Sequence, residues 1–382
     1  MKKLYQIKFL LLFLTFIFSL HKAKPNDIEL FPFQTIRAAG LGGAISCIPI
    51  GIESVIYNPA ALKLTLPFSK KNWEIIINGN TYFQPKYLKP ILEDVFETDN
   101  ITSRVLINAK DLISKSGVGF NTSFVLGYTN KSFGCGLVSM ASFFLQGAPF
   151  PLGTKGFGQI QLSIPFANSF IALESNYYKI AMGISLAPTV GIYKELDGKD
   201  VDAIAGGTET LDSIIFQAIN HPYVSVPMDL GALFVFPNFI NSPVELRIST
   251  VLDNLFGDYF VPGYNIRPIT NSVSLNTGIC FFIPYNIFGQ SCYSLISAEI
   301  KSLNLIMSGN LGFWKALHIG TEFSINNFLQ IQVGLSSGYP CVAAEIKVLA
   351  LGFGILWETI ESGKYIGDNP LSIFKVGVSI NF

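Results

Sequence analysis

The sequence predicts an all-β protein, a transmembrane antiparallel β-barrel of about 14 strands with an N-terminal plug, or hatch, in its lumen. Three observations lead to this fold class. They are an export signal, an apolar composition without a membrane-spanning helix, and alternating apolar and polar residues that continue to the last residue. A closed barrel fits them together, because it satisfies every backbone polar group inside a bilayer.

The chain begins with a predicted signal peptide over residues 1–23. The first eight residues include three lysines, and an apolar run from Phe9 to Leu20 follows them. This run has the length of a signal-peptide core and is too short to span a bilayer comfortably. The first cysteine, Cys47, is too distant for lipid attachment. We therefore expect export to the outer membrane of a Gram-negative-type bacterium, with the mature chain starting between Leu20 and Lys24.

The composition favours a membrane protein. Apolar residues make up 49% of the chain and charged residues only 14%, whereas about a quarter of a soluble domain is charged. After the signal, no apolar run reaches the length that a spanning helix requires, and the longest, Val348 to Trp357, is broken by Gly352 and Gly354. The formal net charge is zero, which argues against a nucleic-acid partner.

The predicted barrel, residues 67–382, consists of segments in which apolar and polar residues alternate. In the last one, Phe374, Val376 and Val378 fall on one face of a strand, and Lys375 and Gly377 fall on the other. This period of two gives a lipid-facing and a lumen-facing side, and an even strand number suits a closed barrel. Glycines inside the segments mark curvature or close approach. The segments are 72–83, 118–129, 132–145, 158–173, 178–192, 224–236, 244–249, 273–283, 293–301, 304–312, 317–323, 329–335, 344–348 and 371–382.

The N-terminal residues 24–66 differ from the barrel segments and are predicted to form the hatch. A stretch rich in small residues, from Arg37 to Ala44, permits close packing in a confined lumen, and Asn58 before Pro59 favours a turn. An ordinary turn is the alternative for this Asn-Pro pair. The predicted hatch and gate residues are Arg37, Gly40, Gly43, Tyr57, Asn58, Pro59 and Ala60.

These motifs resemble the FadL-type outer-membrane transporters of hydrophobic compounds and their PorV-like relatives. The resemblance is carried by Arg37-Ala38, Gly43-Ala44 and Tyr57-Asn-Pro-Ala-Ala-Leu62, with Ala61 where the family usually has glycine. It implies a fourteen-stranded barrel that passes long-chain fatty acids or similar small hydrophobic molecules or lipids past a hatch. The terminal Phe382, with Phe374, also resembles the C-terminal signal that barrel-assembly machinery recognises.

The PorV-like side of the resemblance implies an alternative function. Such a barrel does not transport, and acts instead as a scaffold or shuttle for secreted or surface proteins. A soluble exported β protein is a third interpretation, because a terminal alternating strand also suits a sandwich.

Charged residues on the lumen-facing side predict a polar network of Glu245, Arg247, His318 and Glu322. Mixed signs suggest ion pairs that brace the interior around the hatch, and an ion-selective pore is the alternative. No nucleophile elbow, zinc motif or phosphate loop is present, so we expect neither an enzyme nor a cofactor or metal. Cys280 and Cys292 could face each other across a hairpin, or remain two buried thiols.

Overall fold

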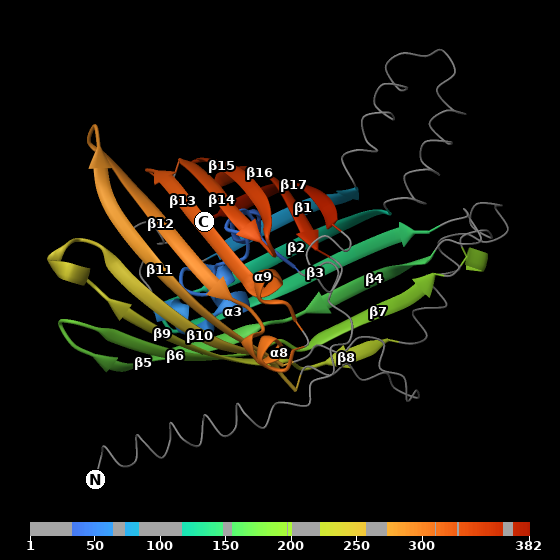
Figure 1. The fold of residues 1–382 in the computed structure, drawn as a ribbon, viewed down its shortest axis with the longest axis horizontal. Coiled ribbons are helices and arrows are strands. Elements are labelled where there is room, and N and C mark those ends of the chain that lie inside the picture. The colour runs from blue at the N-terminus through green and yellow to red at the C-terminus, as the bar shows by residue number, and fades with distance from the viewer. Residues whose placement is uncertain are drawn as a thin grey trace, which may run out of the picture.

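The structure is a computed structural model in which residues 33–63, 73–83, 117–147, 155–196, 198–200, 222–256, 273–309, 311–326, 328–361 and 370–382 are described (Figure 1). The predicted signal peptide and the first residues of the predicted hatch lie outside these ranges.

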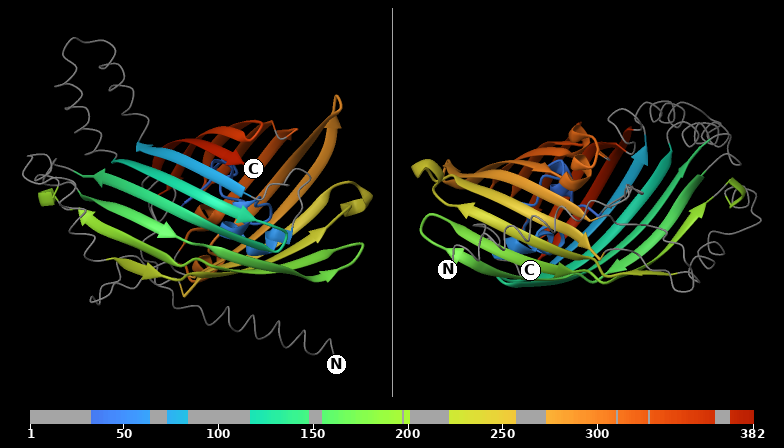
Figure 2. Two further views of the ribbon diagram at one scale, coloured as in Figure 1. Left: turned by 180° about the vertical axis from the view of Figure 1, so that it is seen from behind. Right: turned by 60° about the horizontal axis from the view of Figure 1, so that its bottom comes forward.

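The described strands form one antiparallel sheet that closes into a transmembrane-type barrel around a lumen (Figure 2). Strand β1 pairs on one side with β2 and on the other with β17, which closes the ring. The uninterrupted strands are β1 (Trp73–Phe83), β2 (Val118–Thr129), β3 (Phe133–Gln146), β10 (Glu245–Leu255), β11 (Ser274–Ile287), β12 (Gln290–Ile300), β13 (Leu317–Ile325), β14 (Leu329–Ser336), β15 (Tyr339–Val348), β16 (Leu351–Glu361) and β17 (Pro370–Asn381).

Three neighbouring positions of the wall are each interrupted at a proline. Pro165 separates β4 (Lys155–Ser163) from β5 (Phe166–Glu174). Pro188 separates β6 (Lys179–Leu186) from β7 (Thr189–Leu196), and Pro227 separates β8 (Tyr223–Ser225) from β9 (Met228–Phe236). Proline has no N–H to give to the ladder, although the carbonyl of each of these prolines accepts a backbone hydrogen bond of 2.9 Å from the neighbouring wall position. The 17 strand segments therefore occupy fourteen wall positions, and the predicted strand number is confirmed.

Although the number of strands is correct, the predicted set differs from the structure in two places. Residues 304–312 do not form a strand: α8 (Leu303–Met307) lies there, where the Asn304 side chain accepts a hydrogen bond from Leu275 N and donates one to Val273 O. Strand β16 was missed because its inward positions include glycines and Leu356 instead of polar residues, so it reads as an apolar run.

Side chains alternate between the lumen and the outer surface as the terminal strand predicts. On β17, Phe374 and Val376 are 44% and 47% exposed, whereas Lys375 between them is 2% exposed and donates a hydrogen bond of 3.0 Å to Gln34 O. The outward apolar face is the one that lipid requires. In the described part of the chain, no helix is long and apolar enough to cross a membrane.

The two ends of the barrel differ. We call the end with the short hairpins the turn end: it holds the connections β2–β3, β5–β6, β9–β10, β11–β12, β13–β14 and β15–β16, the start of β1 and the end of β17. Here Phe382 exchanges backbone hydrogen bonds of 3.0 and 3.1 Å with Trp73. The opposite end, which we call the loop end, holds the other connections, and most of their residues lie outside the described ranges.

Residues 33–63, which we call the hatch segment, lie inside the barrel (blue in Figures 1 and 2). They contain α2 (Ile36–Gly40), α3 (Ile52–Tyr57) and the 3-10 helix η1 (Pro59–Lys63). Most of their side chains are buried, including charged and amide ones, because wall strands on several sides of the lumen contact them.

Candidate functional site: the hatch segment and its seat in the barrel

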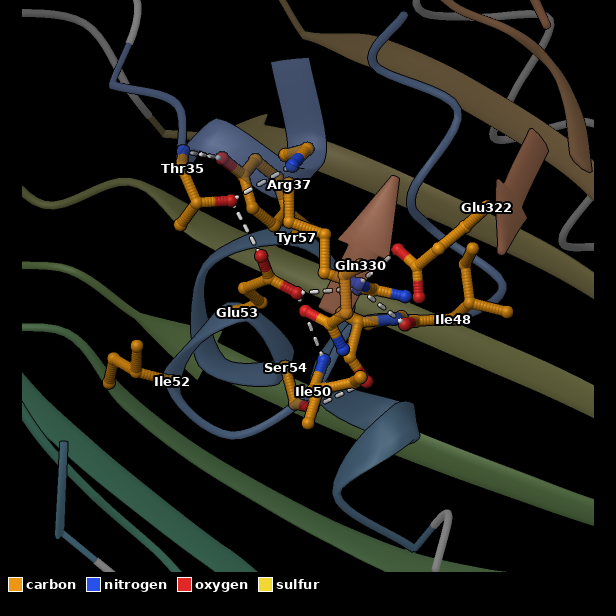
Figure 3. Close-up of polar contacts among 12 residues, drawn as sticks. Thr35, Arg37, Ile48, Ile50, Ile52, Glu53, Ser54, Tyr57, Glu322 and Gln330 are labelled. Atoms are coloured by element: carbon orange, nitrogen blue, oxygen red, sulfur yellow. Dashed lines mark hydrogen bonds and ion pairs between the residues drawn. The ribbon is translucent and has the colours of Figure 1, made fainter. Parts of the chain in front are cut away.

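Arg37 joins the hatch segment to the wall. Its Nε lies 2.7 Å from Glu322 Oε2 on β13, and its Nη1 lies 2.9 Å from Glu53 Oε2 on α3 (Figure 3). The same Nη1 donates to Ile48 O at 3.1 Å. Thr35 caps α2 by accepting a hydrogen bond from Ala38 N, and its hydroxyl donates to Glu53 at 2.5 Å. One buried guanidinium thus ties α2, α3 and the wall together.

Glu322 is 1% exposed and receives donors from three directions. Besides Arg37, Tyr293 Oη donates to it at 2.6 Å and Gln332 Nε2 at 3.3 Å. A buried ion pair repays its desolvation only when further hydrogen bonds satisfy its lone pairs, and these donors satisfy this carboxylate.

The Asn-Pro motif forms a turn that sits directly on the wall. Asn58 is fully buried, donates from Nδ2 to Ser46 O at 2.8 Å, and accepts from Ala60 N at 3.0 Å through Oδ1. Gly183 and Gly231, which face each other on β6 and β9, lie beneath it. A Cβ on Gly231 would lie 2.1 Å from Asn58 Oδ1, and one on Gly183 would lie 2.4 Å from the Pro59 carbonyl carbon.

The other predicted hatch and gate residues lie in the same segment. Gly40 approaches the wall so closely that a Cβ would lie 2.5 Å from the Ala343 Cβ, and Gly43 has a left-handed φ of 87°. Tyr57 Oη accepts a hydrogen bond of 3.3 Å from Thr35 N, and Ala60 packs in an apolar cluster with wall residues of β6 and β9.

The wall carries glycine wherever the hatch segment touches it most closely. Among the described residues, ten wall glycines would place a Cβ less than 3.0 Å from a hatch atom, a distance that Cβ atoms essentially never show. They are Gly127, Gly134, Gly136, Gly183, Gly231, Gly278, Gly320, Gly334, Gly354 and Gly377. These ten glycines, which we call the glycine seat, come from strands around most of the wall and therefore surround the hatch segment. Sequence reasoning linked strand glycines to close approach but did not identify what approaches them.

The predicted lumen network is divided between several places. Glu322 belongs to the Arg37 cluster. Arg247 is paired instead with Glu245 at 2.6 Å, and its guanidinium lies 5.0 Å from the centre of the Phe282 ring. His318 contacts the hatch segment, with Nδ1 2.5 Å from Gly42 O.

The five cysteines are all thiols. The expectation that Cys280 and Cys292 could face each other is wrong, because the hairpin turns at residues 288–289 and sets Cys280 opposite Ser297 and Cys292 opposite Tyr285. Cys47 of the hatch segment instead contacts the wall, with Sγ 3.1 Å from Ser249 Oγ.

A small cavity of about 100 Å³ with a mixed polar and apolar lining lies between the hatch segment and strands β1 and β14–β17. Its charged lining residues are Arg37, Glu53, Glu74, Glu345 and Lys347. Arg37 Nη2 and Glu345 Oε1 are buried without a hydrogen-bond partner among the described residues. A cavity of this size has room for a few water molecules that could bridge such atoms.

One part of the lumen wall near the loop end is apolar. A buried cluster joins Tyr82, Phe144, Phe157, Leu371 and Ile373 from β1, β3, β4 and β17. The rings of Phe144 and Phe157 lie 6.2 Å apart, and Phe157 stacks on Tyr193 at 5.8 Å. The sequence does not predict this cluster: Phe144 is expected among the aromatic residues of a membrane interface, whereas the structure buries it in the lumen.

In the described ranges, no group of three or more histidine, cysteine, aspartate or glutamate side chains could hold a metal ion.

No protein-family model matches the chain, and no curated protein matches it. Solved barrels resemble it at low identity. The Pseudomonas putida toluene transporter TodX has a TM-score of 0.44 at 12% identity, covering 92% of this chain and 98% of that one. CdiB from Acinetobacter baumannii has a TM-score of 0.38 at 8% identity and covers 81% of this chain, which spans only 60% of CdiB. The translocator domain of the autotransporter NalP from Neisseria meningitidis has a TM-score of 0.31 at 8% identity, covering 83% and 91%.

Proposed function

We propose that this chain is an outer-membrane barrel that passes small hydrophobic compounds, such as long-chain fatty acids or aromatic hydrocarbons, past the hatch segment. The turn end would face the periplasm and the loop end the outside, because such barrels have short inner turns and longer outer loops.

The apolar cluster near the loop end is the observation that carries this proposal. A water-filled pore for ions or sugars needs a polar lining, whereas Phe144, Phe157, Leu371 and Ile373 turn apolar surface inward. Each CH₂ group that leaves water gains about 0.8 kcal/mol. An apolar molecule would therefore partition into this part of the lumen.

The hatch segment would be the gate. It occupies the lumen, contacts wall strands on several sides and is fixed by the Arg37 bonds and the glycine seat. Passage of a molecule larger than water requires a local shift of this segment. The cavity beside Arg37 is a place where the packing between hatch and wall is incomplete.

The test compares two adjacent phenylalanines of β3 that face opposite sides. Phe144 is buried in the lumen cluster, and Phe143 faces outward, where it stacks on Phe120 at 5.7 Å. In nanodiscs, Phe144→Ser should weaken binding of a fluorescent fatty acid about tenfold or more, which corresponds to 1.4 kcal/mol, and should slow its uptake into proteoliposomes.

The control variant, Phe143→Ser, should leave lumen binding unchanged. If the wild-type barrel neither binds nor passes the probe, the transport proposal is wrong. Stoichiometric co-purification of a secreted protein with such an inactive barrel would support the scaffold alternative.

A further inference from the structure

The hairpin tips at the turn end carry large apolar side chains that are more than half exposed. Phe288 is 100% exposed, Leu349 96%, Tyr177 82%, Ile240 81% and Phe328 52%. They belong to five consecutive hairpins of the rim, and the remaining hairpin, β2–β3, has the polar residues 130–132 at its tip.

Three of these side chains also occupy an unfavourable backbone conformation. Phe288, Leu349 and Ile240 have φ values of 50°, 56° and 56°. The left-handed region suits glycine and asparagine in tight hairpins, and it is strained for branched or bulky residues. In water, these tips combine backbone strain with exposed apolar surface, so glycine or asparagine would be the better residue on both counts.

A turn at the opposite end shows that the conformation does not require an apolar residue. Ser337 and Gly338 connect β14 to β15 at the loop end with φ values of 52° and 83°. Phe288 and Gly289 at the turn end have nearly the same values, 50° and 78°. The same two-residue turn thus carries serine at one end of the barrel and phenylalanine at the other.

The apolar tips continue the lipid-facing surface of the wall. Leu349 lies between Val348, 52% exposed, and Leu351, 44% exposed, and both of these belong to the outward apolar face. Beside this turn, Trp73 and Phe382 are also exposed at the barrel seam. At this hairpin, residues 348–351 include no polar residue between the tip and the outward apolar face of the wall.

We propose that the turn end is embedded in the interface of one membrane leaflet, where its apolar hairpin tips contact lipid directly. The tips are spread along the rim on separate hairpins, an arrangement that fits a surrounding lipid layer, whereas a single protein partner would need them gathered into one patch. This inference depends on the barrel alone and holds whether or not the lumen transports.

The experiment places an environment-sensitive nitrobenzoxadiazole dye at single engineered cysteines. The variants are Phe288→Cys, Leu349→Cys and the matched control Ser337→Cys, each combined with Cys135→Ser because Cys135 is partly exposed, and labelled in folded protein, where the other four native thiols are buried. Dye-treated Cys135→Ser protein gives the background. Phosphatidylcholine nanodiscs leave both ends of the barrel accessible to water, and spin-labelled lipid with its nitroxide just below the headgroup serves as the membrane quencher.

We expect dyes at positions 288 and 349 to emit at shorter wavelength than the dye at 337, to be quenched by the spin-labelled lipid and to be protected from aqueous iodide. Iodide quenching at 288 and 349 as strong as at 337 would overturn the inference. Iodide quenching in nanodiscs combined with protection in native membranes would also overturn it, and would assign the tips to a protein partner.

Discussion

Arg37 Nε and Glu322 Oε2 lie 2.7 Å apart although 285 residues separate them in the chain. This contact fixes α2 against β13, and both side chains are almost fully buried.

Removal of the Glu322 carboxylate should loosen the hatch segment. Glu322→Leu leaves Arg37 with Glu53 as its remaining carboxylate partner, and breaking one side of a buried pair costs about 3–5 kcal/mol. Hydrogen exchange in nanodiscs should show faster exchange of the α2 and α3 amides with little change in the barrel strands.

Two further variants sharpen this test. Glu245→Gln, which alters the separate and partly exposed pair with Arg247, should leave hatch exchange unchanged. The triple variant Arg37→Met, Glu53→Gln, Glu322→Leu should recover much of the protection, because it removes every charge of the cluster and leaves no buried charge unpaired. Unchanged exchange in Glu322→Leu would show that the ion pair does not hold the segment.

A single methyl group on the glycine seat should displace the Asn-Pro turn. Gly231→Ala places a Cβ against Asn58 Oδ1, and overpacking of this kind typically costs about 1–3 kcal/mol. Limited proteolysis should then cut within residues 33–63. Gly79→Ala on β1 is the control, because its Cβ would meet nothing within 4 Å. Equal protease resistance of the two variants would contradict the claim that the Asn-Pro turn needs a glycine at position 231.

Cys47 can report on the position of the hatch segment. Burial raises the pKa of its thiol, so that at any pH it holds less reactive thiolate than an exposed cysteine. Alkylation at pH 8 should be slow in the wild-type protein and faster in Glu322→Leu, with the modified residue identified by mass spectrometry. Rapid alkylation of Cys47 in the wild type would mean that the segment leaves its seat without any mutation.

The hatch segment should keep the lumen closed to ions. Purified wild-type protein in planar bilayers should lack the steady conductance of an open porin, and deletion of residues 33–63 should produce it because the barrel wall remains. The same deletion should abolish selective uptake of the hydrophobic probe. A large, stable conductance of the wild type would favour the ion-selective pore.

The wall was largely predictable because its pattern is local. On β17, the alternation of Phe374, Lys375 and Val376 is enough to assign the outward and inward faces, and the structure agrees. Each of the segments 158–173, 178–192 and 224–236 contains one of the three interrupting prolines, yet the alternating pattern predicts a single strand for each. Their alignment across three neighbouring strands depends on register, which one strand alone does not reveal.

The seat of the hatch segment could not be read in the same way. The small residues from Arg37 to Ala44 and the Asn-Pro turn predict a compact element, but its partners are single residues spread over distant strands. Glu322, Gly231 and Gly334 look like ordinary strand positions until the barrel brings them to the lumen. Strand β16 was missed for a related reason, because Gly352, Gly354 and Leu356 occupy inward positions where other strands have polar residues.

The closure of the wall by its first and last strands has a consequence for biogenesis. The hatch segment precedes every described strand in the chain, whereas its partner Glu322 on β13 and the closing strand β17 come near the end. Contacts between such distant parts of a chain form late and slowly. Until then Arg37 has only Glu53, within the hatch segment, as a carboxylate partner, so the segment should reach its final position late in folding, together with the closure of the ring.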